Sequence, residues 1–176
     1  MTFLLLKIFK KLIKLIMDNK DPKQIAVGFS FGMLLGLAPS NLLYLLIVLF
    51  CVSLFKVNVS GAFFGALVFG ALSYVIDPIS NQIGVFLLIS QEGLIPFWTL
   101  LYNTPVLPWL NFNNTLMLGS IVLGLLSFVP VYFGFLKFIA YFRTHLKEKL
   151  ANSKLIKGLK ASPVFKWAFK LQELSE

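Results

Sequence analysis

Charged residues are almost missing from the middle of this 176-residue sequence. Between Gln24 and Leu136, more than a hundred residues, the only charged side chains are Lys56, Asp77 and Glu92. A soluble domain carries roughly 25% charged residues, whereas this chain carries 13% and is 58% hydrophobic. The stretch is therefore typical of protein embedded in a membrane, and its composition excludes an ordinary water-exposed surface.

Residues suited to catalysis or metal binding are equally scarce. Cys51 is the only cysteine, which excludes a disulfide framework or a thiolate metal site built from this chain alone. His145 is the only histidine and lies in a basic segment, where we expect a solvated role. The apolar region holds no carboxylate pair at helical spacing and no phosphate-binding glycine loop. We therefore expect a non-enzymatic protein with no cofactor and no metal.

The charge that is present lies at the two ends of the chain. Residues 1–23 hold six Lys against two Asp, and residues 137–176 hold eight Lys and one Arg against three Glu. Because basic flanks of apolar helices face the cytoplasm, both termini are predicted to be cytoplasmic, with an even number of crossings, two or four. The lysines flank apolar segments instead of forming a separate basic domain, so membrane phospholipid is the expected partner and nucleic acid is not.

The charge pattern divides the chain into an amphipathic interfacial helix (1–20), a membrane domain (21–142) and a basic cytoplasmic amphipathic tail (143–176). Within the first part, residues 3–17 place four lysines on one narrow stripe of an otherwise apolar helix. Such a helix lies in the membrane interface or packs on the protein's own transmembrane helices, and both remain open. The lysines expected to bind anionic lipid are Lys7, Lys10, Lys11, Lys14, Lys154, Lys157, Lys160, Lys166 and Lys170.

The membrane domain is predicted to be all-α and polytopic, with broken or re-entrant helices. Asp21-Pro22 is typical of a helix start, and the helix expected over 22–38 is too short to span a membrane. Further helices are expected over 41–55, 59–76, 78–90 and 115–137, the last continuing to about 150 with a kink at Pro130. The proline-rich and aromatic residues 91–114 predict an interfacial loop with short helical pieces.

Two proline-containing sequences, Pro39-Ser40-Asn41 and Pro78-Ile79-Ser80-Asn81, are predicted to break the membrane helices at similar points. We expect the breaks to form a polar notch from Pro39, Ser40, Asn41, Asp77, Pro78, Ser80 and Asn81. Asp77 is open to two interpretations: a proton or cation site beside Asn81 or Gln82, or the N-cap of the helix that Pro78 begins. The adjacent proline favours the N-cap.

Glycines spaced by four indicate flat helix faces. The sequence contains Gly28-x-x-x-Gly32-x-x-x-Gly36 in the first apolar helix and Gly61-x-x-x-Gly65 in the third. Small residues at this spacing let another helix backbone approach closely. The approaching helix belongs either to a partner protein or to this chain, and packing within the chain is favoured.

The segment Asp21-Pro-Lys-Gln-Ile-Ala-Val-Gly-Phe-Ser-Phe-Gly-Met-Leu-Leu-Gly-Leu-Ala-Pro39 resembles the signature of a bacterial membrane family, domain of unknown function 2062. The pattern is a Pro, then Ile-Ala-x-Gly-x-x-x-Gly, then a second Pro after a short apolar run. Phe55-Lys-Val-Asn58 and Asp77-Pro78 resemble further landmarks, and Asn113-Asn114-Thr115 with Gly119 is similar to a subfamily of this length. The resemblance covers about residues 21–120.

The resemblance implies a small protein of the bacterial inner membrane with no assigned catalytic residues. In the subfamily, the gene often neighbours one for a large, mostly periplasmic protein with a single membrane anchor, which implies such a partner. The function hypothesis is therefore a membrane subunit that docks this partner and organises lipid beside it, in lipid transport between membranes. The alternative is a stand-alone transporter or lipid flippase that uses the polar residues at the broken helices.

Overall fold

The structure is a computed structural model that describes residues 21–39, 41–55 and 57–151, with side chains described to residue 144. Every regular element in this part of the chain is a helix, which confirms the predicted all-α class. The predicted N-terminal amphipathic helix (1–20) and the part of the predicted tail after Ala151 lie outside the described residues, whereas the first part of that tail continues the last helix. The elements are α2 (Pro22–Leu37), α3 (Leu42–Leu54), α4 (Val59–Val85), a π-helical turn (Phe86–Ser90), a 3-10 turn (Glu92–Leu94), α5 (Ile95–Tyr102), a second 3-10 turn (Leu107–Leu110) and α6 (Thr115–Ala151).

Two helical stretches are long and apolar enough to cross a membrane. They are Val59–Ser90, with 32 residues, and Thr115–Thr144, with 30 residues, whereas α2 and α3 have only 16 and 13. The chain divides into two compact units, Met1–Lys137 and Phe138–Glu176, and the packing described below lies within the first. The lengths and compositions of the two stretches indicate association with a membrane.

Side-chain caps define where the helices begin. Asp21 accepts a hydrogen bond from the backbone N–H of Lys23 at 2.9 Å, and Pro22 occupies the first position of α2. Asn41 and Asn58 cap α3 and α4 in the same way. Each cap satisfies one backbone donor that a helix start leaves without a partner. The predicted starts of the first three helices are therefore confirmed, to within a residue.

The glycines of α2 lie against the backbone of α4. No Cβ would fit at these three positions, because each faces a backbone carbonyl: Gly28 faces Asn58, Gly32 faces Ala62 and Gly36 faces Ala66. The contact points advance together along both helices, so α2 and α4 run parallel. The packing alternative favoured from the sequence is the arrangement found in the structure.

The glycines of α4 complete this contact from the other side. A Cβ at Gly61 would lie 2.7 Å from the carbonyl oxygen of Ile25, and one at Gly65 would overlap that of Phe29. Both helices therefore contribute small residues to one close crossing, and dispersion contacts between their backbones replace those of larger side chains.

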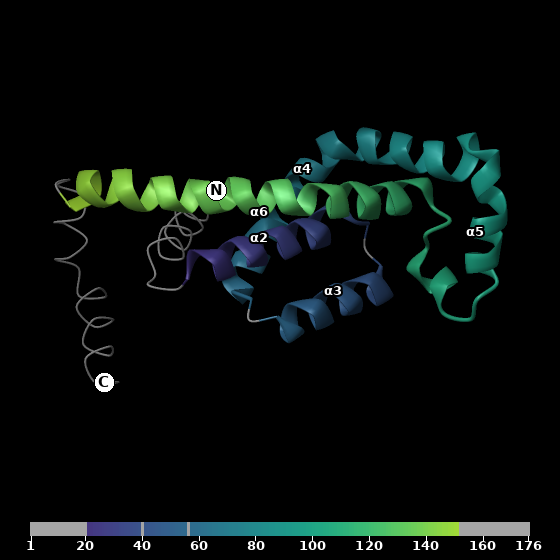
Figure 1. Cartoon of the computed structure of the whole chain (residues 1–176), viewed down its shortest axis with the longest axis horizontal. Coiled ribbons are helices and arrows are strands. Elements are labelled where there is room, and N and C mark those ends of the chain that lie inside the picture. Colours follow the sequence, from purple (N-terminus) through teal and green to yellow (C-terminus); the bar gives the residue numbers. More distant parts are fainter. Residues whose placement is uncertain (1–20, 40, 56, 152–176) are drawn as a thin grey trace. The chain divides into compact units, whose positions relative to one another are not determined.

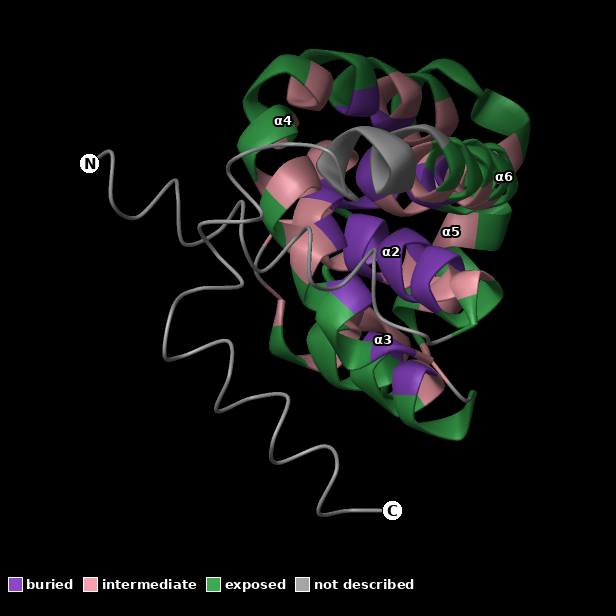
Figure 2. Ribbon diagram, turned by 90° about the vertical axis from the view of Figure 1, so that its left-hand side faces the viewer, coloured by how far each residue is buried: buried purple, intermediate pink, exposed green. Residues whose placement is uncertain are grey.

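α2 is the most buried helix, as the colouring in Figure 2 shows. Ile25 and Met33 have no exposed surface, and the ring of Phe29 stacks on Phe135 of α6 at a centroid distance of 3.8 Å. Later residues of α2 contact earlier residues of α6: Phe31 meets Phe128, and Leu34 meets Gly124. The first unit thus packs α2 between α4 and an antiparallel α6.

The predicted break at Asp77-Pro78 is wrong. Pro78 lies inside the continuous helix α4, and Asp77 is a half-buried residue of the helix interior, not an N-cap. A proline removes one backbone hydrogen bond and crowds the preceding turn, which bends a helix without ending it when packing holds both halves. Figure 1 shows α4 changing direction part-way along its length. α2 holds its first half, and α6 holds its second half.

The connection from α4 to α6 contains short helical pieces, as predicted. Phe86–Ser90 winds as a π-helix, and the indole N–H of Trp98 in α5 donates to the carbonyl oxygen of Leu87 at 2.8 Å. Phe112 is 7% exposed and lies against the rings of Trp98 and Tyr102. These contacts join α5 to the π-helical turn before it and to the segment that precedes α6.

Replacing Gly32 with Ala tests the close contact between α2 and α4. The added methyl meets the carbonyl of Ala62, so we expect the free energy of unfolding to fall by about 1–3 kcal/mol. Gly134→Ala in α6 is the matched control, since nothing lies within 4 Å of its added methyl. The free energy of unfolding of the control should rise by up to about 1 kcal/mol, because alanine has a higher helix propensity than glycine. Thermal unfolding in detergent, followed by circular dichroism, measures the stability of both variants. Equal changes in stability for Gly32→Ala and Gly134→Ala would contradict the close packing of α2 on α4.

Candidate functional site

The glycines proposed as a packing or partner interface are all used inside the chain. Gly28, Gly32 and Gly36 face α4, while Gly61 and Gly65 face α2. A partner helix cannot occupy these faces while the helices remain in contact. A site that faces outward must therefore be built from other residues.

A second close crossing joins α4 to α6. Gly84 lies against the backbone of Thr115, and Gly119 lies against the backbone of Ser80. The hydroxyl of Thr115 donates to the side-chain oxygen of Asn81 at 2.6 Å. The crossing is antiparallel, because higher numbers on one helix meet lower numbers on the other.

Sequence reasoning missed this crossing, although a signal was present. Ser80-x-x-x-Gly84 and Thr115-x-x-x-Gly119 have the same small-residue spacing as the predicted faces. The expected helix break at Pro78 hid the first pair, since it assigned Ser80 to a broken turn. Tertiary packing places Ser80 in the middle of a helix contact instead.

Two hydroxyl groups at this end of the first unit have no hydrogen-bond partner. Ser80 is 0% exposed and Ser120 is 1% exposed, and neither Oγ is bonded within the described structure. Ser30, also fully buried, instead donates to the carbonyl of Ala26 at 3.1 Å. An unsatisfied buried hydroxyl costs free energy, so each of these two groups destabilises the packing around it.

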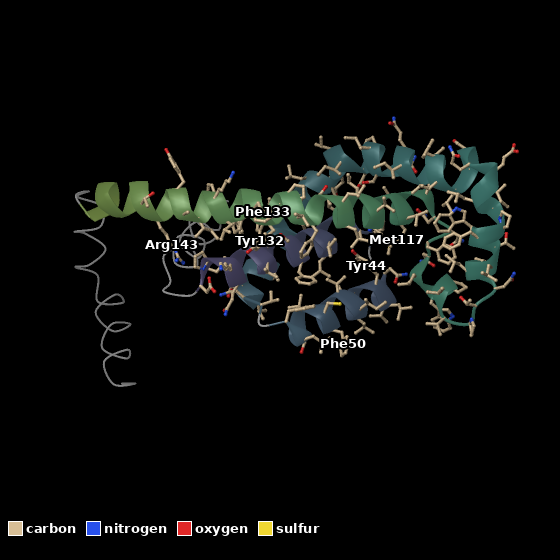
Figure 3. The ribbon with its side chains drawn as sticks, in the orientation of Figure 1. Tyr44, Phe50, Met117, Tyr132, Phe133 and Arg143 are labelled. Atoms are coloured by element: carbon tan, nitrogen blue, oxygen red, sulfur yellow. The ribbon has the colours of Figure 1, made fainter. Side chains whose placement is uncertain are left out.

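The tip of the α2–α3 hairpin is held by polar contacts. The side chain of Asn41 accepts from the N–H of Tyr44 and donates to the carbonyl oxygen of Trp109, each at 2.9 Å. The hydroxyl of Tyr44 donates to the carbonyl oxygen of Leu34 at 3.1 Å, which satisfies the last turn of α2. Figure 3 shows Tyr44 on the side of α3 toward α2 and Phe50 on the opposite side. The tip is thus tied to both α2 and the α4–α6 connection.

The predicted polar notch does not form as a single set. Asn41 bonds to the segment at Trp109, whereas Asn81 bonds to Thr115 of α6. Pro39 is half-buried at the hairpin tip, and Ser40 lies outside the described residues. The two proline sequences therefore belong to different contacts: one ends a helix and the other lies within α4.

The other residues predicted to bind a ligand are the lysines near the two ends of the chain. All nine predicted lipid-binding lysines lie outside the described residues. Within the described part of the chain, no group of three or more His, Cys, Asp or Glu could hold a metal ion. What the described chain presents to its surroundings is mainly apolar: examples are Phe63, Val75, Leu126 and Phe133, each more than half exposed.

Ser80→Ala measures the cost of the unbonded hydroxyl. Because the hydroxyl has no partner, its removal should raise the free energy of unfolding by about 1–3 kcal/mol. The matched variant Ser30→Ala removes a bonded hydroxyl and should lower stability by about 0.5–1.5 kcal/mol. Thermal unfolding of the two variants gives the comparison. A loss of stability in Ser80→Ala would show that this hydroxyl has a partner.

Comparison with known proteins gives one match. The profile of a family described as an uncharacterized protein conserved in bacteria (DUF2062) matches residues 6–148. Neither the curated proteins nor the solved structures give a match. The matched range includes both close crossings and the hairpin, and it agrees with the resemblance carried by the proline and glycine pattern after Asp21. The chain belongs to the DUF2062 family of uncharacterized bacterial proteins.

Proposed function

We propose that this protein is a non-enzymatic subunit of the bacterial inner membrane that docks a larger, membrane-anchored periplasmic protein and organises lipid beside it. The observation that carries the proposal is the exposure of large apolar side chains along both candidate spans. Such surfaces suit acyl chains or an apolar helix of another protein. Lipid transport between membranes is the process in which we place the pair.

Helix directions support a topology for the subunit. α2 and α4 run parallel, while α6 runs antiparallel to both. Since α2 and α3 are too short to span ~30 Å of hydrocarbon, we assign the two long stretches to full crossings and α2 and α3 to a re-entrant hairpin. The hairpin enters and leaves on one side, and its tip bonds to the α4–α6 connection at the other side. Two crossings return the chain to its starting side, so both basic ends face the cytoplasm.

The position of the partner follows from the faces that remain free. The glycine faces are filled by the chain's own helices, so the partner's membrane anchor must meet an outward face. α6 offers one in Leu125, Leu126, Val129 and Phe133, which are 54–70% exposed and share one side of the helix by their three- and four-residue spacing. An anchor helix with small residues would pack closely on this face.

The basic ends supply the lipid contacts of the proposal. Each lysine near an anionic membrane surface contributes about 1 kcal/mol of attraction. Lys7, Lys10, Lys11 and Lys14 on one stripe, with the lysines of the tail, would gather anionic headgroups on the cytoplasmic leaflet. The subunit would thereby concentrate lipid next to its partner.

Mass spectrometry of the protein extracted gently from its native membrane tests this function. We expect a large periplasmic protein at a fixed ratio to the subunit, together with anionic phospholipid. Leu126→Gln and Phe133→Gln together should release the partner, because a polar amide on an apolar interface must be desolvated. Leu72→Gln on α4, at 44% exposure, is the control outside the proposed face. A subunit that copurifies with lipid alone would contradict the docking role.

A second candidate is a small transporter or lipid flippase that acts alone. It is favoured by the two unbonded buried hydroxyls, Ser80 and Ser120, and by Asp77, an ionisable residue of intermediate burial one turn before Ser80. An ionisable group in a membrane segment is commonly part of a substrate or ion path. In this alternative the α4–α6 crossing opens to admit a polar group.

Asp77→Asn separates the two candidates. If the protein is a docking subunit, the variant should fold, retain its partner and support the same lipid movement as the wild type. Asp21→Asn is the matched control, because asparagine caps a helix as well as aspartate does. Lipid movement in reconstituted vesicles is the measurement. Loss of that movement in Asp77→Asn alone, with the fold intact, would favour the transporter.

A further inference from the structure

α3 is a short apolar helix that is exposed on most of its surface. It has 13 residues, which corresponds to an axial length of about 20 Å. Only Val48 and Val52 are buried, while Leu42 is 72% and Phe50 is 63% exposed. No charged residue occurs between residues 41 and 55. The uncharged, apolar surface of α3 therefore suits contact with acyl chains, which cannot solvate a charged group.

Non-helical backbone both precedes and follows α3. Ala38 and Asn41 are extended at one end, and Phe55 and Asn58 are extended at the other. Where protein does not cover it, non-helical backbone needs water or headgroups to satisfy its hydrogen-bonding groups, whereas Asn58 is 6% exposed and the chain itself covers it. The sequence places Lys56 at the second end, where a charge also requires a polar environment.

Hydrogen bonds fix the two ends of the hairpin. At the tip, the amide of Asn41 donates to the carbonyl oxygen of Trp109 in the α4–α6 connection. At the base, the N–H of Asn58 donates to the carbonyl oxygen of Gln24 in the first turn of α2 at 3.2 Å. These two contacts oppose a sliding of α3 along α2 that would meet a thicker bilayer.

We propose that α3 thins the bilayer beside it and so speeds the passage of phospholipid headgroups between the two leaflets. This inference rests on the membrane placement in the proposed function and adds an activity to it. A hydrocarbon core of about 30 Å exceeds the length of α3 by about 10 Å. Acyl chains next to α3 must shorten or tilt to follow it, because a mismatched bilayer adapts to the protein. The headgroups of both leaflets then come closer together at α3.

Spin labels on two exposed leucines test the thinning directly. In a Cys51→Ala background, Leu46→Cys labels the middle of α3, and Leu126→Cys labels α6 eleven residues after its start. Their exposed fractions are 53% and 70%. In vesicles of 18-carbon phospholipid, we expect a water-soluble paramagnetic reagent to reach the label on α3 several-fold more readily than the label on α6. Equal protection of both labels would overturn the thinning.

The label on α6 also separates this inference from the proposed function. If a water-soluble reagent reaches Leu126→Cys freely, the membrane placement itself is wrong. If oxygen reaches Leu126→Cys and the polar reagent does not, the placement holds and the result at Leu46→Cys decides the thinning. An immobile label on α3 that neither reagent reaches would show that protein covers this helix, which also overturns the proposal.

Asn41→Ser and a lipid-exchange assay complete the test. Serine keeps an oxygen that can cap α3 but lacks the amide that holds Trp109, so accessibility at Leu46→Cys should fall toward that of the control.

The wild type should speed exchange of a fluorescent phospholipid between leaflets by about tenfold over protein-free vesicles. No acceleration would overturn the proposed activity, and unchanged accessibility in Asn41→Ser would overturn the role of the hairpin contact.

Discussion

The close approach of α2 and α4 is the contact on which the rest of the first unit depends. Three glycines of one helix face backbone carbonyls of the other, and the reverse contacts come from Gly61 and Gly65. Because no side chain separates the backbones, any shift of either helix produces a collision or an empty gap. This contact positions α2 so that its other side can pack on α6, and it sets where the α2–α3 hairpin begins and ends.

Polar groups in this chain act mainly on its own backbone. Asp21, Asn41 and Asn58 cap helices, Tyr44 satisfies the end of α2, and Trp98 satisfies a carbonyl in the π-helical turn. In an apolar environment each such bond avoids the cost of an unpaired donor or acceptor. The hydroxyls of Ser80 and Ser120 are exceptions among the described residues, because both are buried and neither has a hydrogen-bond partner.

The two proline sequences show how tertiary contacts change a local prediction. Pro39 ends α2 because the preceding residue, Ala38, takes the extended conformation that proline favours, and Asn41 then caps a new helix. Pro78 has the same kind of neighbours in the sequence, yet Asp77 stays helical. Packing on α2 before it and on α6 after it holds both halves of α4, so the cost of one lost hydrogen bond bends the helix without ending it.

The sequence by itself determined the helical class, the starts of α2, α3 and α4, the extent of α6 and the family, since caps, apolar runs and glycine spacing are local signals. Only the tertiary structure decided which helices the glycines join, and that Asn41 and Asn81 serve separate contacts. It also revealed the α4–α6 crossing through Gly84 and Gly119. These features depend on which segments meet in space, and small residues permit a close contact without specifying the helix that makes it.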